Sequence, residues 1–190
     1  MGLLSKWLHK TRTHVVASYV DGAVLDLGCG EDATILKIVS GKIEKFYGID
    51  IEQSIITQLN ERHPKAKFFV RNLDEDNFNL DIKFDRILLV AVIEHLFNQK
   101  HLFKEILKYL KPSGKIIITS PTYFGNDIIH RWGSSIGLFS NDSNDDHIVI
   151  YNKQRFKILA KEFNLKIEKY EKFELGCNQL VILTKAYSAY

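Results

Sequence analysis

A short apolar run that ends in two glycines constrains the fold of this chain more than any other feature. Residues 23–30 read AVLDLGCG, so a buried strand leads directly into a tight turn at Gly28 and Gly30. Glycine allows turn conformations and a close approach of the backbone to a ligand. Residues 33–40 follow with apolar positions at helical spacing. Strand, glycine turn and helix in this order are typical of an α/β sheet that binds a ligand at its edge.

Strand-like and helix-like segments alternate along the rest of the chain. We expect strands at residues 45–50, 67–70, 84–90 and 115–120, helices at 53–63, 98–110 and 153–164, and a turn at 111–114. Two final strands, 165–173 and 179–184, have no helix between them and should pair as an antiparallel hairpin. The sequence therefore predicts a doubly wound, Rossmann-like α/β sheet of about seven strands, mostly parallel, with an antiparallel C-terminal hairpin and helices on both faces.

The length of 190 residues favours a single domain. We divide it into an N-terminal helix (1–22), a ligand-binding core (23–120), an insertion (121–150), and a C-terminal helix with the hairpin (151–190). The insertion is long, polar and dotted with aromatic residues, and loops of this length are usually functional. We therefore expect the insertion to act as a lid over a ligand.

Composition and charge exclude several classes of protein. Two cysteines are too few for a disulfide framework or a four-ligand zinc site, and the net charge of +3 is spread along the chain, unlike a nucleic-acid-binding surface. No apolar run is long enough to span a bilayer, and the first residues do not read as a signal peptide. We expect a cytoplasmic protein. The N-terminal helix should dock on the sheet or cover a cleft, and its basic residues leave membrane-surface binding as a less favoured alternative.

Asp50 ends the second expected strand, 20 residues after Gly30, where a carboxylate can accept hydrogen bonds from ribose hydroxyls. Gly28, Gly30 and Ala33 alone fit the G-x-G-x-x-A pattern of a dinucleotide site, or simply a tight turn. However, a pyrophosphate would be disfavoured beside Asp26 and its acidic neighbours in the loop. A cofactor that carries positive charge and no phosphate would suit the same loop better.

Four segments in order resemble the motifs of class I S-adenosylmethionine-dependent methyltransferases. They are VLDLGCGED (24–32), GIDIEQSII (48–56), FDRILLVAVIEHL (84–96) and LKPSGKIIITSPT (110–122). The resemblance covers about residues 23–184, and the IEHL element is similar to the small-molecule branch that includes ubiquinone-type O-methyltransferases. One departure is Asp32, where the family often has a third glycine.

The resemblance implies S-adenosyl-L-methionine as the cofactor and suggests residues that bind it. Asp26 would lie near the methionine part, Asp50 would hold both ribose hydroxyls, and Ile51 would contact adenine. The remaining positions are the glycine loop (Gly28, Cys29, Gly30), the adenine edge (Asn72, Leu73), and Val90, whose carbonyl would face the methionine amine.

Few catalytic residues are expected, because the sulfonium of this cofactor already activates the methyl group. His95, just after the fourth strand, and His147, in the insertion, are the candidates for a base; we expect no metal. The apolar run 131–139 suits a small or lipid-like acceptor, and the acidic run 141–146 disfavours nucleic acid. The alternative is a non-catalytic subunit with the same fold. The acceptor, the atom methylated and the oligomeric state stay open.

Overall fold

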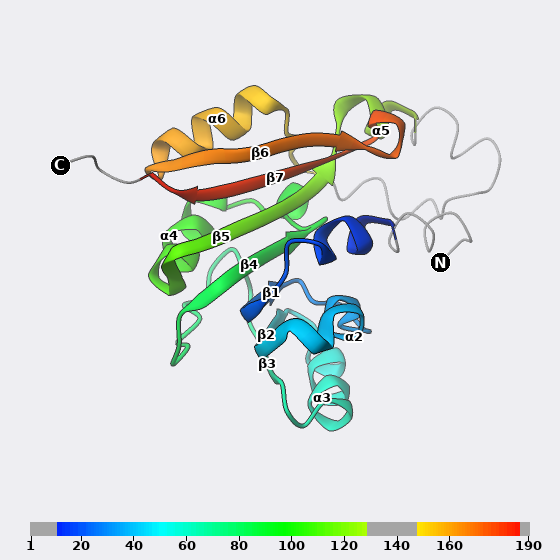
Figure 1. Ribbon diagram of the computed structural model, residues 1–190, viewed down its shortest axis with the longest axis vertical. Helices are drawn as coiled ribbons and strands as arrows, with labels where there is room; N and C mark the ends of the chain where they lie inside the picture. Colours follow the sequence, from blue (N-terminus) through cyan, green and yellow to red (C-terminus); the bar gives the residue numbers. More distant parts are fainter. Residues whose placement is uncertain (1–10, 129–147, 187–190) are drawn as a thin grey trace.

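The computed structural model describes residues 11–128 and 148–186, which form one seven-stranded sheet (Figure 1). The strands are β1 (Gly22–Leu27), β2 (Ile43–Asp50), β3 (Lys67–Val70), β4 (Phe84–Val90), β5 (Leu110–Pro121), β6 (Leu165–Phe173) and β7 (Asn178–Lys185). Their order is β3-β2-β1-β4-β5-β7-β6, and β7 runs antiparallel to both of its neighbours. The predicted fold class, including the antiparallel C-terminal hairpin, is confirmed.

Helices cover both faces of this sheet. Residues 11–17 are helical, and the further helices are α2 (Thr34–Val39), α3 (Gln53–Arg62), α4 (Gln99–Tyr109), α5 (Tyr123–Ile128) and α6 (Lys153–Glu162). Short 3₁₀ turns lie at η1 (Ser40–Lys42), η2 (Ile93–His95) and η5 (Glu174–Gly176). One core cluster joins the sheet to α4 and α6, and the other joins it to the N-terminal helix, α2 and α3. Figure 1 shows α6 beside β6, and α2 and α3 near β2 and β3.

The described part of the N-terminal helix docks on the sheet. Val16, Ala17 and Val20 are buried in the second core cluster. The Arg86 side chain on β4 fixes the end of this segment, because its Nε donates to the Tyr19 carbonyl at 2.9 Å and its Nη2 pairs with Asp21 at 2.8 Å. Docking on the sheet, rather than on a membrane surface, therefore accounts for residues 11–21.

The predicted turn at residues 111–114 is wrong, because this segment belongs to β5. Phe84 pairs with Leu110 and Arg86 pairs with Lys115, so four residues of β5 (111–114) lie opposite the single residue Asp85 of β4, an excess of three. The chain accommodates them as an irregularity in the ladder. Turn-forming residues mark that bulge and do not end the strand pairing.

The insertion predicted at 121–150 is only partly described. Its first residues form α5, a helix that the sequence does not predict, and residues 148–150 have no regular secondary structure. His147 and the apolar run 131–139 lie outside the described residues, so the lid stays a prediction. In the described ranges, no helix has the length and apolar character needed to cross a membrane.

Candidate functional site

The glycine turn after β1 has the conformation that only glycine adopts without strain. Gly28 and Gly30 have φ values of +68° and +63°. The Gly28 N–H donates to the Ile49 carbonyl at 2.8 Å, which fixes the turn against the end of β2. A Cβ on Gly28 would lie 2.6 Å from Cγ2 of Val92, whereas a Cβ on Gly30 would meet no atom within 4 Å. Gly28 is therefore required by packing as well as by conformation.

Asp50 joins the end of β2 to this turn. Its Oδ2 accepts from the Gly30 N–H at 2.9 Å, and its Oδ1 accepts from the Glu52 N–H at 3.2 Å. An ionised carboxylate offers about four lone-pair positions, so two backbone bonds leave acceptor capacity for a ligand. Asp50 is half-buried and can accept hydrogen bonds from a diol while it stays fixed to the backbone.

A cavity of about 370 Å³ opens at this edge of the sheet, where the parallel strands end. We call it the cofactor cavity. Its lining residues are Gly28, Asp50, Ile51, Arg71, Asn72, Leu73, Asp74, Ala91, Val92, His95 and Leu96. Six of them were predicted from the sequence: Gly28, Asp50, Ile51, Asn72, Leu73 and His95. The cavity therefore unites the ends of β1, β2, β3 and β4 around one space.

Four other predicted residues lie next to the cavity and do not line it: Asp26, Cys29, Gly30 and Val90. Asp26 is 4% exposed, and burial, with a smaller contribution from Asp50, raises its pKa to about 7. Burial also raises the pKa of the Cys29 thiol, helped by both aspartates, so Cys29 is unsuited to act as a nucleophile. Val90 ends β4, and its neighbour Ala91 takes the position on the cavity wall.

The loop after β3 is held by its own side chains. Asn72 Oδ1 accepts from the Asp74 N–H at 3.0 Å, and the Asn72 N–H donates to Asp76 Oδ2 at 2.8 Å. Asp74 in turn accepts from the Asn98 N–H at 2.7 Å, just before α4. Asn72 therefore fixes the loop that presents Leu73, and it also lines the cofactor cavity.

Sequence reasoning missed several residues of the cavity: Arg71, Asp74, Ala91, Val92 and Leu96. Arg71 directly follows β3, and its N–H donates to the Asp50 carbonyl at 3.0 Å. Ala91 directly follows β4, has a φ of +56°, and donates to the Thr119 carbonyl at 3.0 Å. A rule that considers every residue after a parallel strand would have found both.

The residues present fit a cationic cofactor better than a dinucleotide. Asp50 and Asp74 line the cavity, and Asp26 lies buried at the end of β1. Of the lining side chains, Arg71 carries the permanent positive charge, and its Nη1 donates to the carbonyl of Val70 at 2.7 Å. A pyrophosphate would face two carboxylates here, whereas a sulfonium or an ammonium would be stabilised by them.

The two candidate bases have different outcomes. His95 lies on η2, lines the cofactor cavity with an exposed side chain, and donates its backbone N–H to the Val92 carbonyl at 3.0 Å. His147 lies outside the described residues. Within the described ranges, no three His, Cys, Asp or Glu side chains gather as a metal site would require.

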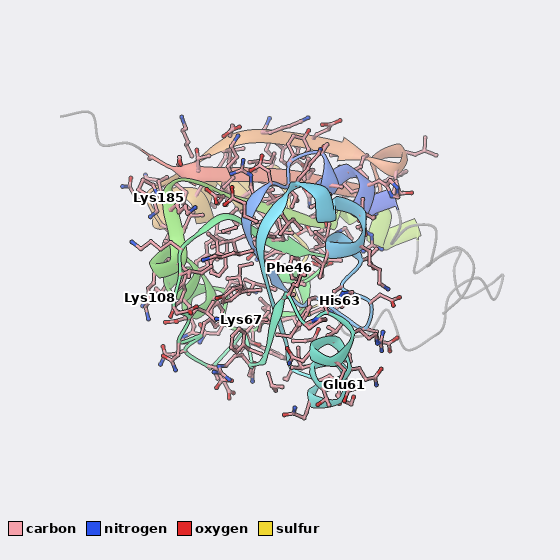
Figure 2. The ribbon with its side chains drawn as sticks, turned by 60° about the horizontal axis from the view of Figure 1, so that its bottom comes forward. Phe46, Glu61, His63, Lys67, Lys108 and Lys185 are labelled. Carbon is pink, nitrogen blue, oxygen red and sulfur yellow. The ribbon has the colours of Figure 1, made fainter. Side chains whose placement is uncertain are left out.

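Two further cavities lie away from this edge. One of about 480 Å³ lies between β2 and the end of α3, where Phe46 and His63 line it (Figure 2). His63 is half-buried, with its ring centroid 6.2 Å from that of Phe68. The other, of about 610 Å³, lies between α6 and β6 and is lined by lysines of α6. Neither includes a predicted site residue.

The sheet and the acidic cavity define a Rossmann-like protein that binds a nucleoside-type cofactor at the end of its parallel strands. Comparison with known proteins narrows this class. The profile of the family described as "Methyltransferase domain" matches residues 5–170, so the chain belongs to that family. The cofactor of the related methyltransferases is S-adenosylmethionine.

Two curated relatives match most of the chain. Phosphoethanolamine N-methyltransferase of Plasmodium falciparum is 29% identical over 175 residues, which is 88% of this chain and 57% of that protein. Malonyl-[acyl-carrier protein] O-methyltransferase 1 of Ilyobacter polytropus is 27% identical over 163 residues, 78% of this chain and 58% of that protein. The chain spans 35% to 58% of the length of the curated relatives it matches.

Solved structures share the fold over almost the whole chain. The PH0226 protein of Pyrococcus horikoshii superposes with a TM-score of 0.72 at 20% identity, over 95% of this chain and 91% of that one. The glycopeptide N-methyltransferase MtfA in complex with S-adenosylmethionine superposes with a TM-score of 0.68 at 13% identity, over 91% of this chain and 92% of that one. At these identities the likeness establishes the fold.

Proposed function

We propose that this chain transfers a methyl group from S-adenosyl-L-methionine to a small-molecule or lipid-like acceptor. The observation that carries the proposal is the cofactor cavity, in which Asp50 is fixed to the Gly30 backbone beside an acidic wall. Such a wall suits a ligand with ribose hydroxyls and positive charge. The family membership supports the same chemistry.

The acceptor class is drawn from relatives and from the cavity's surroundings. The names of two relatives give phosphoethanolamine and a malonyl group on acyl-carrier protein as their acceptors. The IEHL element at 93–96 adds a finer proposal, a likeness to ubiquinone-type O-methyltransferases. Among the residues that line the cavity, Leu96 is apolar and would tolerate a partly apolar acceptor.

Different residues of the chain would bind different parts of the cofactor. When bound, S-adenosylmethionine supplies a methyl group that its sulfonium already activates. Asp50 would accept from the ribose hydroxyls, and Asp26 would stabilise the cationic methionine end. The Gly28 backbone permits close approach, and Val92 keeps water from the cavity wall.

His95 is the proposed base among the described residues. It lies on η2 at the cavity, on the side where an acceptor bound beyond β4 would lie. A neutral imidazole there could take the proton that an acceptor hydroxyl or amine loses as its new bond to the methyl group forms. His147 stays a second candidate, proposed from the sequence alone.

Calorimetry and a transfer assay test the proposal together. The chain should bind S-adenosylmethionine, and a metabolite screen with labelled cofactor should reveal a methylated product. His95→Ala should lower the transfer rate by about 10²–10⁴-fold without changing cofactor affinity. His14→Ala, at an exposed position on the N-terminal helix, is the control. Cofactor binding without transfer to any acceptor would favour the non-catalytic alternative.

A further inference from the structure

Several buried polar side-chain atoms of the described residues have no hydrogen-bond partner. Six such side-chain atoms occur in residues 11–128 and 148–186. Four of the six are Nε of Arg12, Oε2 of Glu94, Oγ1 of Thr119 and Oε1 of Glu174. Buried polar groups in folded proteins nearly always have partners, so four exceptions in one region need an explanation.

Strand register places Thr119 and the β6–β7 turn on the same face. Thr119 pairs with Leu180, and Pro121 pairs with Asn178. Because paired residues share a face and every second residue of a strand does too, the Thr119 and Asn178 side chains lie on one face. Asn178 Nδ2 donates to Oε2 of Glu174, which holds the Glu174 carboxyl near that face. The turn is strained, since Glu174 has a φ of +51°.

The N-terminal helix brings Arg12 to the same place. Arg12 precedes the buried Val16 by one helical turn, so both lie on the side of the helix that packs on this face. The guanidinium is close enough for its charge to oppose the rise in pKa that burial causes in both Glu94 and Glu174. Even so, no ion pair within 4.0 Å joins Arg12 to either carboxyl among the described residues. Arg12 therefore does not neutralise either carboxyl by direct contact.

Glu94 connects these polar groups to the cofactor cavity. It lies on η2, is 1% exposed, and directly precedes the cavity-lining His95. Its backbone carbonyl accepts from the N–H groups of Ile148 and Val149 at 2.8 and 3.1 Å, which fixes η2 while the carboxyl oxygen stays unpartnered. Burial raises the pKa of Glu94 to about 7, against smaller opposing contributions from its own backbone N–H and from the charge of Arg12.

We infer that Glu94, Glu174, Thr119 and Arg12 form an anchor site for an amine group of the methyl acceptor. Two carboxyls against one guanidinium leave an excess of negative charge, and an ammonium has three N–H donors for the three unpartnered oxygens. The Arg12 Nε would then donate to an oxygen next to that amine. This inference rests on the proposed function, and it identifies the methyl acceptor as an amino alcohol.

The test uses ethanolamine as the probe. Ethylene glycol, which has a hydroxyl in place of the amine, is the control ligand. Both are titrated into the whole chain, with S-adenosylhomocysteine present, and binding is followed by ligand-observed NMR. Ethanolamine should bind and ethylene glycol should not. Glu94→Gln and Glu174→Gln should each weaken ethanolamine at least about tenfold, because each removes a charge-assisted bond. Glu61→Gln, at an exposed position on α3 (Figure 2), should leave it unchanged.

The affinity of each variant for S-adenosylhomocysteine shows whether it has folded with an intact cofactor cavity. Equal responses to the two probes, including no response, would overturn the anchor site, as would wild-type ethanolamine binding in both Gln variants. Neither result bears on the methyl-transfer proposal, which fails separately if the wild-type chain does not bind S-adenosylhomocysteine.

Discussion

The Gly30 N–H donates to the Asp50 carboxylate at 2.9 Å, across 20 residues of sequence. This bond makes the glycine turn after β1 and the end of β2 a single unit. The residue proposed to hold the ribose therefore also fixes the backbone proposed to lie against the cofactor. Removing the Asp50 carboxylate should therefore also disturb the backbone at Gly30.

Replacing Asp50 by Ala should weaken S-adenosylmethionine binding by about ten- to a hundredfold. The variant loses hydrogen bonds to a charged group and also leaves the Gly30 and Glu52 N–H groups without their acceptor. Asp50→Asn, which keeps one side-chain oxygen, should lose less. Isothermal calorimetry measures both variants, with Glu61→Ala as the surface control. Wild-type affinity in Asp50→Ala would remove Asp50 from the cofactor site.

Gly28 and Gly30 form a matched pair for testing the role of packing in the turn. Both have positive φ, so an Ala at either should cost about 1–3 kcal/mol of stability. Gly28→Ala should cost more, because its Cβ would lie 2.6 Å from Cγ2 of Val92. Thermal unfolding compares the two variants. Adding Val92→Ala should recover part of the Gly28→Ala loss and none of the Gly30→Ala loss.

Substitutions at Gly28 and Gly30 should also differ in their effect on cofactor binding. Gly28 lines the cavity and Gly30 does not, so Gly28→Val should lose S-adenosylmethionine binding while Gly30→Ala retains most of it. Calorimetry on both variants decides this. A wild-type dissociation constant for Gly28→Val would mean that this glycine serves only the turn.

The fold was predictable because its signal is local. Apolar runs and glycines mark the strands of a parallel sheet, and each cavity residue that the sequence identified lies at the end of a strand, in the glycine turn or in the segment that follows a strand. The segment 111–114 was misread because a bulge in β5 uses the same residues as a turn. Only the pairing with β4 distinguishes the two.

The anchor site could not be predicted from the sequence, because its residues form no local sequence pattern. Arg12, Glu94 and Glu174 come from segments about 80 residues apart, and each alone resembles a surface residue. Their significance depends on burial and on missing partners, which only the packed structure supplies. Thr119 likewise reads as an ordinary strand residue.

Glu94 should make the protein less stable as the pH rises. Its pKa is raised from 4.5 to about 7 in the folded state, so the folded state binds more protons between these values. Stability therefore falls as the pH rises from about 4.5 to about 7, by about 3 kcal/mol from this group. Glu94→Gln has no carboxyl to ionise, so it should lack this pH-dependent loss. Above pH 7 its free energy of unfolding should therefore rise relative to that of the wild type. Urea unfolding across this pH range measures it. A pH-independent difference would place the carboxyl in solvent.

Asp26 should couple cofactor binding to a proton. Burial and the nearby Asp50 raise its pKa to about 7, so part of the population carries a neutral Asp26 at neutral pH. A cationic cofactor favours the ionised form, and its binding should release a proton from that fraction. Affinity for S-adenosylmethionine should therefore rise as the pH increases from about 6 to about 8, and the calorimetric enthalpy near pH 7 should depend on the ionisation enthalpy of the buffer.

Asp26→Asn should bind more weakly, with a flatter pH profile and less proton release. Asp32→Asn, at an exposed loop position that is already paired with Lys37 at 2.9 Å, is the matched control and should keep the wild-type profile. If the wild-type enthalpy were the same in phosphate and Tris, Asp26 would lie too far from the positive charge of the cofactor to sense it.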